Sequence, residues 1–275
     1  MTTPRATIST TVSRYEEGVP IGDQADELAA EEPLEIRIEG HSIAVVMRTP
    51  GHDRELAAGF LLTEGIILSA KDLFDITTCV ASGAAGKGNV VDVALTQPEA
   101  FDFTKLTRHV FTSSSCGICS KASIEAVRRR GPPLSDEVVF SPEFVLSLPA
   151  RLGHEQQTFK RTGGLHACAL FDRAGALVAV REDVGRHNAL DKLIGHALLA
   201  KTIPLRAHLV LLSGRASFEM MQKAYAAGIP AVAAISAPSG LAVEFARQSG
   251  QTLAGFVRGK SMNIYTGAQR ITRGT

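Results

Sequence analysis

The second half of the chain alternates short apolar runs with helical segments of about ten to twelve residues, and this alternation constrains the fold more than any other feature. Strands separated by helices imply parallel crossover connections, with the helices packed on the faces of a sheet. The pattern therefore predicts the α/β class. The expected strands are 207–212, 231–235 and 252–257, and the expected helices are 186–200, 216–227 and 240–249.

A hairpin precedes this series. Residues 165–171 and 176–181 are strand-like and flank a turn signal at 172–175. Because an antiparallel hairpin then leads into parallel strands, the sheet is expected to be mixed.

The first half is less regular. It predicts a hairpin over 34–47 that turns near Gly40, helices over 55–67, 121–130 and 141–152, and a strand over 90–95. Residues up to about Pro20 are rich in Thr and Ser and have no apolar core segment, which is typical of a disordered tail.

We expect three parts: a disordered tail over 1–20, a smaller N-terminal α+β subdomain over 21–140 that carries a Cys pair, and an α/β domain over 141–275.

Composition excludes several classes of protein. The net charge of +1 over 275 residues gives no general argument for binding nucleic acid or an acidic membrane, so any anion site must be local. No run of about 18 apolar residues occurs, and no membrane span is expected. The four cysteines are too few for a disulfide scaffold of this length. Without an export signal, we expect a reducing cytoplasm.

Cys116 and Cys119 lie where a Ser/Gly-rich stretch changes to a helical pattern, with Ser120 as a plausible N-cap. A thiol near a helix N-terminus has a lowered pKa, so the pair suits nucleophilic sulfur, either as a persulfide carrier or as a redox dithiol. A zinc site needs about four ligands and the sequence has no second Cys pair, but metal and a packed, inert pair both stay open. Cys79 and Cys168 lie in apolar runs and are expected to be structural.

Polar residues follow each of the three expected parallel strands. Ligands of open α/β sheets bind beyond the carboxyl ends of the strands, and two of these segments open helices, where free N–H groups suit a phosphate. Arginine and lysine add positive charge. Together they predict a phosphate-bearing ligand at this edge. The three segments are Ser213-Gly214-Arg215, Ser236-Ala237-Pro238-Ser239-Gly240 and Arg258-Gly259-Lys260-Ser261.

A polar segment from Arg181 to Lys192 lies at another strand-to-helix junction. A solvated helix start would explain its carboxylates, but it explains a histidine there less well. A site role and a purely structural role are about equally supported for Asp183, Arg186 and His187.

Several motifs, in order along nearly the whole chain, resemble the formate dehydrogenase accessory sulfurtransferase family, FdhD. The one departure is Ser120, where the family usually has Gly, and this change leaves both thiols in place. The motifs are Ser114–Cys119, Thr162–His166, Arg181–Lys192, Leu212–Arg215 and Gly255–Tyr265.

The resemblance implies a cytoplasmic sulfurtransferase that accepts sulfur from a cysteine desulfurase. Its acceptor would be the bis-molybdopterin guanine dinucleotide molybdenum cofactor, before insertion into the formate dehydrogenase catalytic subunit. Cys116 would hold the persulfide and Cys119 would assist. The family also implies a homodimer, and GDP as a possible mimic of the cofactor. Combined with the strand ends, the expected cofactor-binding residues are Phe256, Val257, Arg258, Gly259, Lys260, Ser261, Ser213, Gly214, Arg215 and His187.

The family fold resembles that of cytidine deaminase, so the expected architecture is a deaminase-like mixed sheet with flanking helices. A zinc deaminase needs His-x-Glu on one helix and Pro-Cys-x-x-Cys on the next. The nearest positions, 187–189 and 213–217, contain neither Glu nor Cys. Deamination and a metal site are therefore not expected. The rival functions are a zinc-binding module and a cofactor chaperone whose cysteines are incidental.

Overall fold

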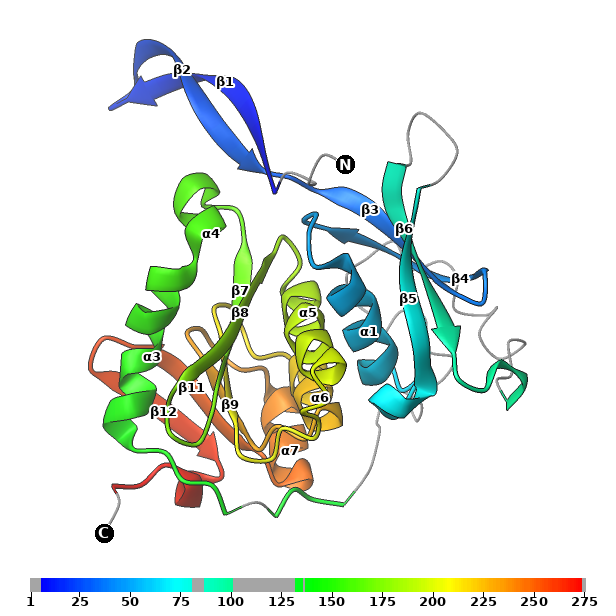
Figure 1. The fold of residues 1–275 in the computed structure, drawn as a ribbon. Coiled ribbons are helices and arrows are strands. Elements are labelled where there is room, and N and C mark those ends of the chain that lie inside the picture. Colours follow the sequence, from blue (N-terminus) through cyan, green and yellow to red (C-terminus); the bar gives the residue numbers. More distant parts are fainter. Residues whose placement is uncertain (1–5, 81–86, 101–131, 136, 274–275) are drawn as a thin grey trace.

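The computed structural model describes residues 6–80, 87–100, 132–135 and 137–273 (Figure 1). Its main sheet has six strands in the order β12-β11-β10-β9-β7-β8. Strands β9, β10 and β11 are parallel, and the outer pairs are antiparallel. This arrangement confirms the α/β class and the mixed sheet. The strands are β7 (His166–Phe171), β8 (Leu177–Asp183), β9 (Leu209–Leu212), β10 (Ala231–Ala234), β11 (Thr252–Arg258) and β12 (Ser261–Thr266).

Helices cover both faces of this sheet, because its central strands are apolar on both sides. Alternate residues of β9, such as Val210 and Leu211, belong to two different core clusters. The first cluster lies under α5, α6 and α7, and the second lies under α3 (Figure 1). These helices are α3 (Pro142–Glu155), α5 (Arg186–Leu199), α6 (Phe218–Ala226) and α7 (Gly240–Ser249).

A second sheet of four strands, in the order β4-β3-β6-β5, carries α1. The predicted hairpin over 34–47 is confirmed and turns at Glu39 and Gly40, both of which have positive φ. Helix α1 ends earlier than predicted, since the chain turns into a left-handed residue at Gly65. The elements are β3 (Glu32–Ile38), β4 (His41–Arg48), α1 (Asp53–Thr63), β5 (Leu73–Val80) and β6 (Lys87–Leu95).

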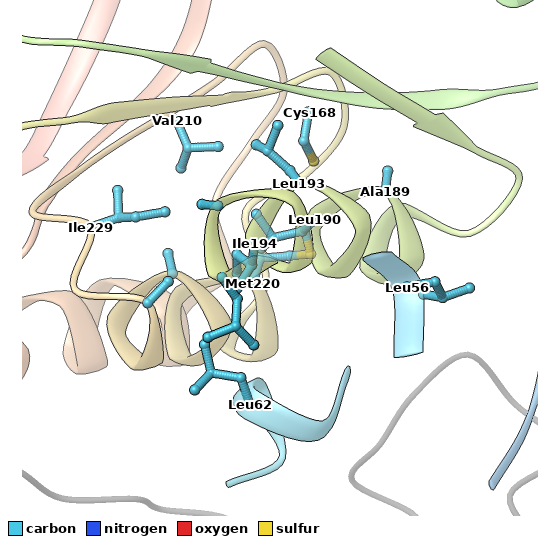
Figure 2. Packing of buried hydrophobic residues seen from close by; sticks show 14 of the residues in the cluster. Leu56, Leu62, Cys168, Ala189, Leu190, Leu193, Ile194, Val210, Met220 and Ile229 are labelled. Carbon is cyan, nitrogen blue, oxygen red and sulfur yellow. The ribbon is translucent and has the colours of Figure 1, made fainter. Parts of the chain in front are cut away.

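The two sheets share one hydrophobic core, which forms around the crossing of α1 and α5. Leu56 and Leu62 of α1 lie in the same cluster as Leu190 and Ile194 of α5 (Figure 2). The division into subdomains at residue 140 stays a prediction, but this shared core joins residues from both sides of it.

The predicted disordered tail over 1–20 is wrong for the described residues after Ala6. Strand β1 (Thr7–Glu16) pairs with β2 (Val19–Ala29) in a separate antiparallel hairpin. Strand β1 is rich in Thr, Ile and Val, which favour extended backbone, and its Thr and Ser content obscured this signal. The short helix α4 (Gln157–Thr162) and strand β12 were also not predicted. The predicted helix over 121–130 lies outside the described residues.

Two glycines allow α1 and α5 to touch along their backbones. A Cβ on Gly59 would lie 1.8 Å from the carbonyl oxygen of Asp191, and a Cβ on Gly195 would lie 1.8 Å from that of Glu55. No side chain fits at either position. The chain therefore uses glycine here in spite of its low helix propensity.

We expect Gly59→Ala and Gly195→Ala each to lower the free energy of unfolding by about 1–3 kcal/mol or more, because the helices would have to separate. Urea unfolding followed by circular dichroism measures the change. Gly153→Ala in α3 is the matched control, since its Cβ would meet nothing within 4 Å. That variant should be neutral or slightly stabilising. Equal effects at Gly59 and Gly153 would contradict the close helix contact.

Candidate functional site

One edge of the main sheet collects the carboxyl ends of β8, β9, β10 and β11. Because β7 runs antiparallel to its neighbours, its first residue, His166, lies at the same edge. Helices α5 and α6 begin there, directly after β8 and β9, and α7 begins after β10. This edge is the usual ligand-binding position of an open α/β sheet.

The loops after β9 and β10 run side by side. The Ala216 N–H donates to Ala237 O (3.2 Å), and the Ser239 N–H donates to Ala216 O (3.0 Å). Ser213 is tied to β7, where its hydroxyl accepts from the Ala167 N–H (2.9 Å). The structure thus brings two of the three predicted strand-end segments into direct contact.

The third segment joins them through Phe256, whose N–H donates to Ser236 O (3.1 Å). Phe256 has a φ of 52°, a left-handed conformation that is uncommon for a bulky residue and costs energy. Arg258 stacks 5.4 Å from the Phe256 ring centroid. The Gly259 and Lys260 turn then leads into β12.

Not every predicted cofactor-binding residue presents a side chain at this edge. Val257 is fully buried in the second core cluster, so its side chain cannot reach a ligand there and only its backbone could. Alternation along β11 explains this, because neighbouring residues of a strand face opposite sides. Arg258, Gly259, Lys260, Ser261 and Arg215 are exposed.

The starts of α5 and α6 meet at His187, which is 5% exposed. Its Nε2 lies 2.7 Å from Oε2 of Glu219, a close contact that lacks the alignment of a hydrogen bond. Gly214 lies beside the next histidine, since a Cβ there would be 3.3 Å from His166 Nδ1. Neither Glu219 nor Ser217 was predicted from the sequence as a site residue. Their position at the start of α6, directly after the loop that follows β9, is the sequence signal that could have identified them.

Asp183 has a structural role in this arrangement. Its carboxylate is fully buried and pairs with Lys192 Nζ at 2.7 Å. It also accepts from the backbone N–H of Thr49 (3.1 Å) and of Gly185 (2.8 Å) and from Asn188 Nδ2 (3.0 Å). These bonds anchor the loop after β4 to the start of α5 and so fix the position of His187.

His166 is half-buried next to positive charge. Burial of the imidazole, followed by the charges of Arg186 and His187, lowers the pKa of His166 below its usual 6.5. His166 is therefore neutral at pH 7, and one ring nitrogen can accept a hydrogen bond.

The predicted sulfur nucleophiles, Cys116 and Cys119, lie outside the described residues. Cys168 is buried in β7, and burial raises the pKa of its thiol far above the usual value, which makes it inert. Cys79 is in β5. Within the described ranges, no group of three or more His, Cys, Asp or Glu side chains is placed to hold a metal ion.

The fold and the edge define a mixed-sheet α/β protein in which the starts of α5, α6 and α7 and two histidines lie at one edge of the sheet. The chain belongs to the FdhD/NarQ family, whose profile matches residues 29–272.

Curated relatives match nearly the whole chain. The sulfur carrier protein FdhD of Streptomyces coelicolor is 50% identical over 272 residues, which cover 97% of this chain and 96% of the relative. The protein of the same name from Mycolicibacterium paratuberculosis is 52% identical over 248 residues, 89% of this chain and 91% of its own.

A solved structure shares the fold. The crystal structure of a "putative formate dehydrogenase accessory protein" from Desulfotalea psychrophila superposes with a TM-score of 0.77 at 24% identity, over 97% of this chain and 100% of that one. No helix among the described residues is long and apolar enough to cross a membrane.

We expect Asp183→Asn to lower the free energy of unfolding by about 3–5 kcal/mol, because it leaves Lys192 buried without its counter-charge. Chemical unfolding monitored by fluorescence or circular dichroism tests this. Glu244→Gln, at an exposed position of α7, is the control and should change stability little. A stable Asp183→Asn protein would instead favour a direct role in the site.

The pKa of His166 should lie below 6.5, and Arg186→Gln should raise it by removing a nearby cation. Because the folded-state pKa is lowered, the contribution of His166 to stability is present above its unfolded pKa and is lost as pH falls through the folded value. NMR titration of the imidazole C–H signals measures both values. Arg206→Gln, at an exposed loop before β9, should leave the pKa of His166 unchanged. An Arg186→Gln protein with an unshifted His166 would contradict the predicted proximity.

Proposed function

We propose that this protein is a sulfur carrier that accepts sulfur from a cysteine desulfurase and passes it to the bis-molybdopterin guanine dinucleotide molybdenum cofactor. The observation that carries the proposal is about half identity, over nearly the full length, to proteins named sulfur carrier protein FdhD. The pair Cys116 and Cys119 supplies two thiols with the spacing and local sequence of activated sulfur.

In the proposed loading step, the Cys116 thiolate attacks the terminal sulfur of the desulfurase persulfide. A new S–S bond forms on Cys116 as the S–S bond of the desulfurase breaks, and the desulfurase cysteine leaves as a thiolate. The exchange needs no external oxidant or reductant. Cys119 would assist by sharing or stabilising the transferred sulfur.

The acceptor would bind at the sheet edge. Helix starts at α6 and α7 offer unpaired backbone N–H groups, and exposed Arg215, Arg258 and Lys260 add positive charge suited to the phosphates of a guanine dinucleotide. Bound there as substrate, the cofactor would receive the sulfur before its insertion into a formate dehydrogenase catalytic subunit. We propose a cytoplasmic location and a homodimer on the same family basis.

Mass spectrometry tests the loading step. After incubation with a cysteine desulfurase and cysteine, we expect an adduct of about 32 Da, one sulfur atom, on the peptide that contains Cys116 and Cys119. Cys116→Ala should abolish or strongly reduce the adduct, and Cys119→Ala should reduce it less.

Buried Cys168 is the internal control in the same digest and should stay unmodified. Absence of an adduct on both Cys116 and Cys119 would overturn sulfur transfer. If Cys116→Ala still supported formate dehydrogenase activity in cells, the protein would instead be a cofactor chaperone.

A further inference from the structure

Buried polar atoms without hydrogen-bond partners gather at one place in this protein. The described residues contain five such side-chain atoms, and three of them, Arg186 Nε, His187 Nε2 and Ser217 Oγ, lie at the adjoining starts of α5 and α6. A buried polar atom without a partner destabilises the folded state. Because His187 Nε2 lies 2.7 Å from Glu219, Arg186 Nε and Ser217 Oγ are the two atoms of this cluster that a ligand would have to satisfy.

The charge at this cluster points to the type of ligand. Arg186 forms no hydrogen bond or ion pair with any other described residue, although its Nε is fully buried. Its nearest carboxylate along the chain, Asp183, is already engaged with Lys192 at 2.7 Å. Two histidines, His166 and His187, lie close enough for Arg186 and His187 to depress protonation of His166. The Glu219 carboxylate contacts His187, whereas the guanidinium of Arg186 has no ion-pair partner among the described residues, and a guanidinium in that state favours an anion.

The backbone adds donors to the same place. Gly185 and Ser217 are the N-caps of α5 and α6, and neither helix start has a side-chain cap bond. The N–H groups of the first turn of each helix are therefore available, and the two helix dipoles reinforce each other at this edge. A Cβ on Gly214 would lie 3.3 Å from His166 Nδ1, so glycine lets this loop approach the His166 ring closely.

We propose that Arg186, His187 and Ser217, together with the first turn of α6, bind an oxyanion of the phosphate class. Arg186 donates to it through its guanidinium, Ser217 through its hydroxyl, and neutral His166 forms the wall beside Gly214. His187 is held in the same cluster by Glu219, at 2.7 Å from its Nε2.

This subsite extends the proposed function by adding Arg186, Ser217 and His166 to the ligand-binding edge. It rests on the proposed function only for the idea that a nucleotide supplies the phosphate. The anion could equally be free pyrophosphate, so the two sources are separated by experiment.

Isothermal titration of the full chain with inorganic pyrophosphate, and separately with GDP, tests the subsite. Wild-type protein should bind pyrophosphate, and Arg186→Gln should raise the Kd about tenfold or more, as expected for losing a charge-assisted hydrogen bond. Ser217→Ala should raise it by a smaller factor. Arg206→Gln, which removes an equal charge at the opposite edge of the sheet, is the matched control and should bind like wild type.

The pattern across the two probes identifies the source of the anion. Weaker GDP binding by Arg186→Gln supports a nucleotide phosphate, and an effect on pyrophosphate alone supports a separate anion site. Absence of pyrophosphate binding by the wild type, or equal Kd values for Arg186→Gln and Arg206→Gln, would overturn the proposal.

Two further measurements keep these outcomes interpretable. If Arg186→Gln does not fold, the Ser217→Ala titration and the shift of the wild-type His166 NMR signals on adding pyrophosphate decide the question. Sulfur loading of Cys116 in the wild type is measured separately. Its failure would count against the proposed function and leave the pyrophosphate result standing.

Discussion

The contact between α1 and α5 is the constraint on which the rest of the structure depends. It requires Gly59 and Gly195, since any Cβ would collide with the backbone of the opposite helix. The contact brings α1, which belongs to the small sheet, into the core of the main sheet. The start of α5 carries His187 and Arg186 of the candidate site.

A buried ion pair and a buried hydrogen bond, both to Asp191, secure this contact. Lys223 of α6 pairs with Asp191 of α5 at 2.8 Å, and Thr63 of α1 donates to the same carboxylate at 2.8 Å. Burial opposes the charge of Lys223, but the carboxylates of Asp191 and Glu64 outweigh it and raise the pKa of Lys223. Buried pairs contribute little net stability because desolvation offsets their attraction, but breaking one is costly. We therefore infer that they determine which helices pack together and in which register.

The site contrasts with this core. Asp183, Lys192 and Asn188 satisfy one another directly below the edge, whereas Arg186 and Ser217 retain atoms without partners. Buried polar atoms are normally satisfied, so the two atoms left without partners at this edge are candidates for contact with a ligand. Strain at Phe256, a bulky residue in a left-handed conformation, lies on the same edge. These features support a rigid ligand-binding edge, to which the proposed sulfur transfer from Cys116 would deliver its sulfur.

The sequence by itself determined the alternating strands and helices of the second half, the hairpin over 34–47 and the placing of Ser213 and Ser236 at one sheet edge. Side-chain periodicity and turn residues report backbone geometry directly, so these features can be read locally. Prediction from the sequence failed at β1, because a Thr-rich strand resembles a disordered tail. It also failed for the side chain of Val257, because its burial depends on which face of β11 packs on α3. Only the tertiary structure decided the partners of the charges, such as Asp183 with the backbone of Thr49, and left Arg186 without one among the described residues. Those pairings join residues more than a hundred positions apart, and no local pattern encodes them, because they depend on how the helices pack in space.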